Sequence, residues 1–169
     1  MDKKKILILA GVVLLLLIIV FSCSAPKNKP EKVAKQYADA LFSCKAKKAV
    51  NLVSDRAIKQ SGSKTRKLYE HTIENICDGY KKNMSSKYGD KYKYKTKIID
   101  SYENQITFYD NTIGDYFKID GMTVVLDVSF SGKKEMFFGL TSKKVEESTE
   151  MTVFLIKEHG KWRVLDWNG

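Results

Sequence analysis

Residues 151–167 have the sequence MTVFLIKEHGKWRVLDW, and this stretch decides the fold. Met151 to Lys157 is apolar on both faces of an extended chain, which predicts a strand in the centre of a sheet. His159 and Gly160 are typical of a tight turn, and the segment from Trp162 to Trp167 predicts a strand that pairs back on the first. The chain is therefore expected to close in an antiparallel hairpin.

Two further strands are predicted upstream, because polarity alternates with a period of two. Lysines alternate with Tyr and Thr from Lys91 to Lys97, and apolar residues alternate with mostly polar ones from Met122 to Ser131. Asn104 to Phe117 has nearly helical spacing of apolar residues but is rich in β-formers, so helix and strand both stay open. Glu135 to Leu140 is either a strand or an apolar loop.

The part of the chain before these strands has helical spacing. A helix is predicted to begin at Pro30, a short one to span Lys45 to Val53, and a long one to run from Lys64 to Ser86. Ser54-Asp55 and Gln60 to Ser63 are typical of loops. The apolar stripe of the first helix consists of Val33, Tyr37, Leu41 and Cys44.

Helices followed by strands predict an α+β domain, with helices packed on one face of a curved antiparallel sheet. The segment Tyr37-Ala38-Asp39-Ala40-Leu41, the segment Ala49-Val50-Asn51-Leu52 and the closing hairpin resemble the nuclear-transport-factor-2-like (cystatin-like) cone fold. More narrowly, they resemble the uncharacterised domain of many Gram-positive lipoproteins. The resemblance covers about Pro30 to Trp167 and implies a cone-type, cystatin-like fold. Its motifs are packing patterns, so it implies little about function.

The N-terminus predicts membrane targeting. Three lysines at positions 3–5 precede the apolar run from Ile6 to Phe21, which indicates a cytoplasmic N-terminus and an extracytoplasmic domain. Val20-Phe21-Ser22-Cys23 resembles a lipobox, although Phe at its second position is unusual, and this predicts lipidation of Cys23. An uncleaved signal anchor, which spans the membrane once, stays open as the alternative.

The chain is thus divided into three parts. Residues 1–23 are a lipoprotein signal peptide or signal anchor, residues 24–30 a short polar tether, and residues 31–169 an extracytoplasmic domain. Its expected location is the outer face of the cell membrane, which it reaches through its N-terminus.

Two cysteines remain in the domain, Cys44 and Cys77. Disulfides persist outside the cytoplasm, so these two are expected to form a bridge between helices. Two buried free thiols are the alternative. No metal or other cofactor is expected, because the chain has no Cys-x-x-Cys motif and its two histidines have no Cys or His at ligand spacing.

The formal net charge of +10 is concentrated in one part of the chain, where residues 24–97 hold 19 basic and 7 acidic residues. An extracytoplasmic domain does not meet nucleic acid, so the available partners are anionic lipid or an anionic wall polymer; a protein partner is not identifiable. The candidate residues for anionic-surface binding are Lys91, Lys93, Lys95 and Lys97. These lysines are also typical of a solvated edge strand, which is the competing interpretation.

No enzymatic activity is expected, since nucleophile-elbow, phosphate-loop and zinc-protease motifs are absent from the sequence. The expected function is a binding or scaffolding domain at the cell envelope. One alternative is a cone that holds a small ligand among its aromatic side chains and delivers it to a membrane partner. A weaker alternative is an acid–base enzyme that uses Asp166, which strict alternation places on the inward face with Trp162 and Val164.

Overall fold

The strands form one four-stranded antiparallel sheet in the order β1-β2-β3-β4. We describe residues 28–111, 113–136 and 141–168 of a computed structural model. The predicted lipidation site Cys23, the signal segment and residues 24–27 of the tether lie outside the described residues, as do residues 137–140 of the second uncertain segment. The predicted α+β class with an antiparallel sheet is confirmed.

Four helices precede the sheet among the described residues: α2 (Pro30–Phe42), α3 (Ala46–Val50), α4 (Asp55–Gln60) and α5 (Arg66–Tyr88). Pro30 stands in the first turn of α2, where its missing N–H leaves no intrahelical bond unmade. Thr65 caps α5 by accepting a hydrogen bond from the Leu68 amide. The helices predicted at Pro30, at Lys45 to Val53 and at Lys64 to Ser86 are therefore confirmed to within a few residues.

Helix α4 was not predicted. Ser54, interpreted from the sequence as a loop residue, is the N-cap of this helix, and its buried hydroxyl accepts a hydrogen bond of 3.0 Å from the Ala57 amide. A helix of six residues has fewer than two turns, so it leaves almost no apolar period in the sequence.

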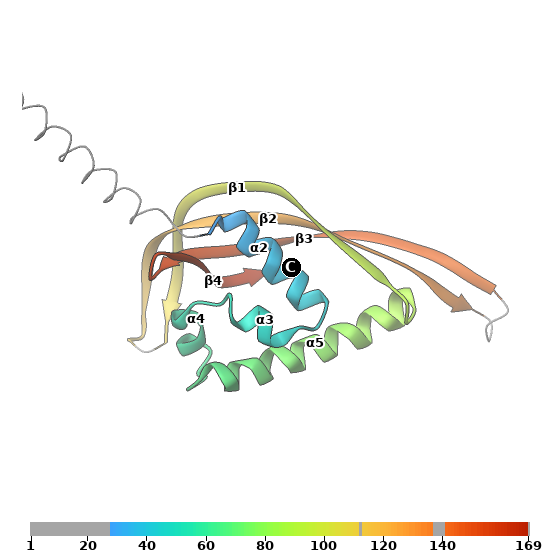
Figure 1. Ribbon diagram of the computed structural model, residues 1–169, viewed down its shortest axis with the longest axis horizontal. Coiled ribbons are helices and arrows are strands. Elements are labelled where there is room, and N and C mark those ends of the chain that lie inside the picture. The colour runs from blue at the N-terminus through green and yellow to red at the C-terminus, as the bar shows by residue number, and fades with distance from the viewer. Residues whose placement is uncertain (1–27, 112, 137–140, 169) are drawn as a thin grey trace, which may run out of the picture.

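The strands are β1 (Lys93–Asp110), β2 (Asp115–Met136), β3 (Thr141–Glu158) and β4 (Lys161–Asn168). The segment Asn104 to Phe117 forms the outer part of the β1–β2 hairpin, which resolves it as strand and turn. Strand β3 lies between β2 and β4, so the predicted central strand is confirmed. Figure 1 shows the sheet arching over α2, α3 and α5.

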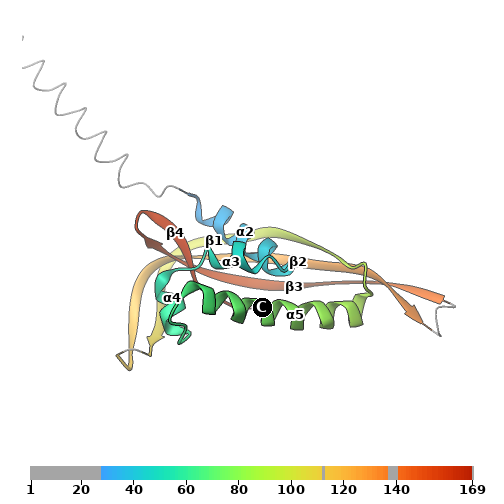
Figure 2. The ribbon, with the colours of Figure 1, turned by 60° about the horizontal axis from the view of Figure 1, so that its bottom comes forward.

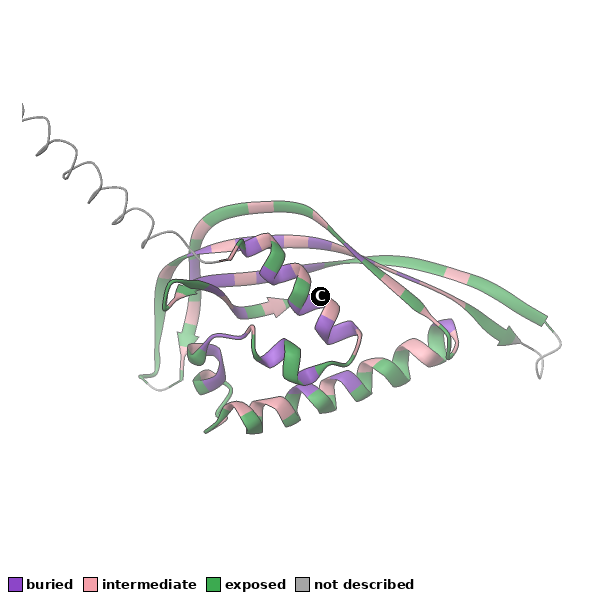
Figure 3. Cartoon of the chain, viewed as in Figure 1, coloured by how far each residue is buried: buried purple, intermediate pink, exposed green. Residues whose placement is uncertain are grey.

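The core lies where α2 crosses the sheet. Inward residues of β2 and β3, such as Leu126 and Leu155, are fully buried, as are Tyr37 and Leu41 on α2. Figure 3 shows buried positions concentrated in the centre of the molecule and mostly exposed positions along the far end of the β2–β3 hairpin. This end, residues 131–136 and 141–148, extends past α5 in both ribbon views (Figures 1 and 2), and we call it the arm.

The chain enters the domain at the β3–β4 hairpin. The side-chain amide of Asn28 donates to the Trp162 carbonyl at 3.2 Å and accepts from the Trp162 amide at 2.8 Å. This paired contact fixes the first described residue to the start of β4, next to the first turn of α2.

Candidate functional site

A basic groove lies between α2, α3 and the start of β1. It has a volume of about 1130 Å³, and we call it the α2 groove. Five lysines line it and Asp39 is the one acid among its lining residues. The lysines are Lys35, Lys45, Lys48, Lys93 and Lys95. An excess of positive charge in a concave surface raises the local concentration of anions.

Asp39 holds β1 against α2 rather than neutralising the whole groove. Its carboxylate forms an ion pair with Lys35 at 2.7 Å and accepts a 2.6 Å hydrogen bond from the Thr96 hydroxyl. The Tyr94 hydroxyl donates to the Asp39 carbonyl at 3.1 Å. Within the described residues, Lys45, Lys48, Lys93 and Lys95 form no ion pair, so their charges are available to a ligand.

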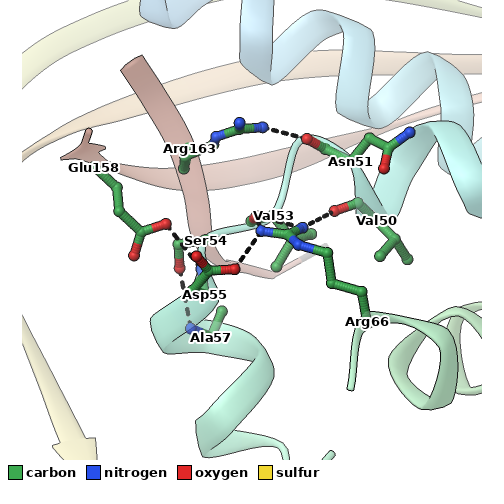
Figure 4. A network of polar contacts seen from close by, with 9 residues as sticks. All are labelled: Val50, Asn51, Val53, Ser54, Asp55, Ala57, Arg66, Glu158 and Arg163. Atoms are coloured by element: carbon green, nitrogen blue, oxygen red, sulfur yellow. Dashed lines mark hydrogen bonds and ion pairs between the residues drawn. The ribbon is translucent and has the colours of Figure 1, made fainter. Parts of the chain in front are cut away.

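The wall formed by Asn51 and Leu52 is held by the polar network in Figure 4. The Arg66 guanidinium donates to the carbonyls of Val50 at 2.8 Å and Val53 at 3.1 Å, and it pairs with Asp55 at 2.6 Å. The Arg163 guanidinium donates to the Asn51 carbonyl.

Backbone hydrogen bonds of 2.8 and 2.9 Å also join the chain on both sides of Val53 to the edge of β4 at Val164. The loop that carries this wall is therefore anchored by backbone as well as side chains.

A second basic hollow of about 830 Å³ lies between the end of α5 and the arm, and we call it the arm hollow. The acids that line it are Asp90 and Glu135. The lysines that line it are Lys91, Lys93, Lys133, Lys134 and Lys144. Lys93 lines both hollows, because it stands on the strand between them.

Two glycines allow α5 and the arm to meet closely enough to form the arm hollow. A Cβ at Gly132 would overlap the Tyr88 carbonyl oxygen, and a Cβ at Gly89 would overlap the Lys133 carbonyl oxygen. Gly89 also has a φ of 86°, which favours glycine. Any larger residue here would force the helix end and the arm apart.

The structure brings three of the four predicted lysines into the two hollows. Lys91, Lys93 and Lys95 line them, whereas Lys97 is exposed but lines neither. Sequence reasoning missed the contributions of α2, α3 and the arm. The doublets Lys133-Lys134 and Lys143-Lys144 were a usable signal, since a hairpin between them brings both together.

Cys44 and Cys77 lie next to each other as free thiols. The Cys44 sulfur is 3.3 Å from the Cys77 carbonyl oxygen, and the Cys77 sulfur is 3.4 Å from the Leu41 carbonyl oxygen. Burial and then the neighbouring Cys44 raise the pKa of Cys77 to about 12, so it is a poor nucleophile while reduced. The disulfide between them stays a prediction, and this proximity is compatible with it.

The inward orientation predicted for Asp166 is wrong. The β3–β4 register shifts between Phe154 and Leu155, so Leu165 becomes an extra residue in β4. Val164 and Leu165 are both buried as a result, and Asp166 is exposed. Strict alternation fails at this bulge, and Asp166 lies outside the core.

Tyr37 carries an unusual buried hydroxyl. The residue is fully buried, and its oxygen is the one buried side-chain polar atom of the described residues without a hydrogen-bond partner. Burial, followed by the nearby Tyr69 and Asp166, raises the pKa of Tyr37 well above its usual value. Its ring packs against Trp167 at 6.5 Å between centroids.

Comparison with protein-family models and with curated proteins gives no relative from which a role could be transferred. No protein-family model matches this chain, and no curated protein matches it significantly. In the part of the chain that the structure describes, no group of three or more His, Cys, Asp or Glu residues is placed to hold a metal ion. No helix over the same residues is long and apolar enough to cross a membrane.

Proposed function

We propose that this chain is a lipoprotein on the outer face of the cell membrane, and that its domain binds an anionic component of the envelope without catalysing a reaction. The observation that carries the proposal is the α2 groove, in which four lysines that form no ion pair with any described residue line one concave surface. Near an anionic surface each such lysine contributes about 1 kcal/mol of attraction at moderate salt. Four lysines together are enough for reversible binding of phosphate-bearing groups.

The proposal includes the family resemblance. Four antiparallel strands that arch over helices support a cone-type, nuclear-transport-factor-2-like domain, as does the helix order before the sheet. Cone domains present concave surfaces between helices and sheet, and the α2 groove lies at such a position. Fold alone does not decide function, so the lysines carry the functional part of the proposal.

The binding test uses the full chain in nanodiscs of zwitterionic lipid. The two probes are vesicles rich in an anionic lipid and soluble polyphosphate, each measured at low and high salt. Replacing Lys45, Lys48 and Lys95 with Gln should weaken salt-sensitive binding of at least one probe. The matched control replaces Lys59, Lys64 and Lys67, three exposed lysines that line neither hollow, and should bind like the parent.

Two results would overturn this proposal. One is a parent protein that binds neither probe at low salt, and the other is a groove variant that binds both probes as the parent does. The anchoring part has its own test: mass analysis of the mature protein should show a lipidated Cys23 at the N-terminus. An intact Met1 on the membrane form would refute lipidation and favour the signal anchor.

A second candidate function has one observation in its favour. The Tyr37 hydroxyl, which has no hydrogen-bond partner among the described residues, is the kind of buried polar group that a small internal ligand could satisfy. A cone that carries a small ligand to a membrane partner would account for it. Native mass spectrometry of the protein purified from its own cells tests this, because a bound small molecule would appear as an added mass.

A further inference from the structure

We infer that the α2 groove and the arm hollow are two parts of one site for a linear polyanion, such as a polymer with a phosphate in each repeat. This inference rests on the proposed function and specifies its ligand. The site runs along the start of β1, with α2 and α3 at one end and the arm at the other.

Continuity between the two parts comes from β1. Lys93 lines both hollows, and its neighbours Lys91 and Lys95 each line one. Lys93 and Lys95 stand on one face of β1, about 6.6 Å apart, and Lys91 lies in the turn just before the strand. A flexible anionic chain can follow such a row from one hollow into the other.

The arm supplies charge that the fold itself does not require. Lys133 is paired with Lys144 and Lys134 with Lys143 across the two strands. Like charges directly opposite each other destabilise a strand pair. Lys144 has partial compensation from Glu146 at 2.8 Å, an exposed ion pair, whereas Lys133 and Lys134 have none among the described residues. An anion bound in the arm hollow, beside Lys133 and Lys144, would remove the repulsion within that pair.

The balance of charge over the whole site is strongly positive. Nine different lysines line the two hollows, against the three carboxylates of Asp39, Asp90 and Glu135. Two more carboxylates, Glu146 and Glu147, lie in an adjoining hollow that Lys93 and Lys95 also line. The C-terminus of α5 adds roughly half a negative charge near the arm hollow. The remaining excess exceeds what one phosphate group neutralises, so a ligand with several charges is favoured.

The shape of the two hollows favours a polymer chain as the ligand over a membrane surface. The charges line hollows of about 1130 and 830 Å³, and the two hollows adjoin the same strand, β1. A flat layer of lipid headgroups cannot enter both concave surfaces at once. An extended polymer can enter both, and we therefore choose the polymer as the occupant.

The test measures the affinity of the full chain in zwitterionic nanodiscs for long-chain polyphosphate and for tripolyphosphate, at equal ionic strength. Two linked contacts raise affinity by about 10²–10⁴-fold over one contact, so the long chain should bind at least tenfold more tightly per molecule. Replacing Lys133, Lys134, Lys143 and Lys144 with Gln should remove most of this difference and leave tripolyphosphate binding to the groove unchanged.

A control variant with Lys59, Lys64, Lys67 and Lys118 replaced by Gln loses the same four charges from exposed positions outside both hollows. It should keep the full difference in affinity, which excludes an effect of net charge alone. Equal affinity for the long and short chains, or an arm variant that retains the difference, would overturn the linear site. Binding of anionic vesicles without binding of either polyphosphate would overturn it too, yet leave the proposed function standing. Failure to bind any of the three probes would overturn both.

Discussion

Replacing Tyr37 with Phe should make the protein more stable. The substitution removes one oxygen that is fully buried and has no partner among the described residues, and the ring keeps its contact with Trp167. Leaving a buried polar group without a hydrogen bond costs about 1–3 kcal/mol. We therefore expect the free energy of unfolding to rise by about 1 kcal/mol or more at pH 7.5.

The gain in stability from Tyr37→Phe should increase at alkaline pH. The pKa of Tyr37 is raised in the folded protein, first by burial, so its phenol keeps its proton while the unfolded chain loses its own above about pH 10. A raised folded pKa means that the wild-type protein loses stability as the pH rises past 10. The Phe variant has no such group, so its advantage over the wild type should be larger at pH 10.5 than at pH 7.5.

The assay is equilibrium denaturation of the full chain in neutral micelles at both pH values. Tyr94→Phe is the matched control: its hydroxyl donates to the Asp39 carbonyl at 3.1 Å, so its loss should cost about 0.5–1.5 kcal/mol. If Tyr37→Phe instead lowers the free energy of unfolding by as much as the control, then the hydroxyl has an internal partner. That result would show that the Tyr37 hydroxyl is not an unsatisfied buried group, and it would support the small-ligand function.

Two further predictions concern the cysteines and the arm. Peptide mapping without reduction, on protein from its native compartment, should link Cys44 to Cys77, and the bond should add roughly 3–4 kcal/mol of stability; two alkylatable thiols would contradict it. Gly132→Ala should destabilise the domain and weaken long-chain polyanion binding, because its Cβ overlaps the Tyr88 carbonyl. Gly79 lies in α5 with open space around it, so Gly79→Ala should instead raise the free energy of unfolding by about 0.5–1 kcal/mol. An equal effect of the two substitutions would refute the close approach of Gly132 to the Tyr88 carbonyl.

The parts of the fold that were predictable are those in which neighbouring residues determine structure. The alternation from Lys91 to Lys97 predicts a strand with its lysines exposed, and all four lysines are exposed. The apolar run from Met151 to Lys157 predicts a central strand for the same local reason. A single extra residue at Leu165 was enough to reverse the prediction for Asp166, since a bulge leaves no clear mark in the sequence.

The candidate site was predictable only in part, because most of it comes from contacts between distant residues. Lys93 shares a hollow with Lys48 only after α3 packs against α2, and shares one with Lys133 only after the arm meets the end of α5. No local pattern encodes the register that pairs Lys133 with Lys144. Sequence reasoning therefore found the middle of the site on β1 and missed both of its ends.

The paired hydrogen bonds of Asn28 to Trp162 limit how far the domain can stand from the membrane. With lipid on Cys23, only five chain steps separate the anchor from Asn28, and a fully extended chain spans at most about 18 Å over that length. This short tether keeps the attachment point at Asn28 within a few Debye lengths of the membrane surface. The arm, which extends past α5, would then move through the space just outside the membrane.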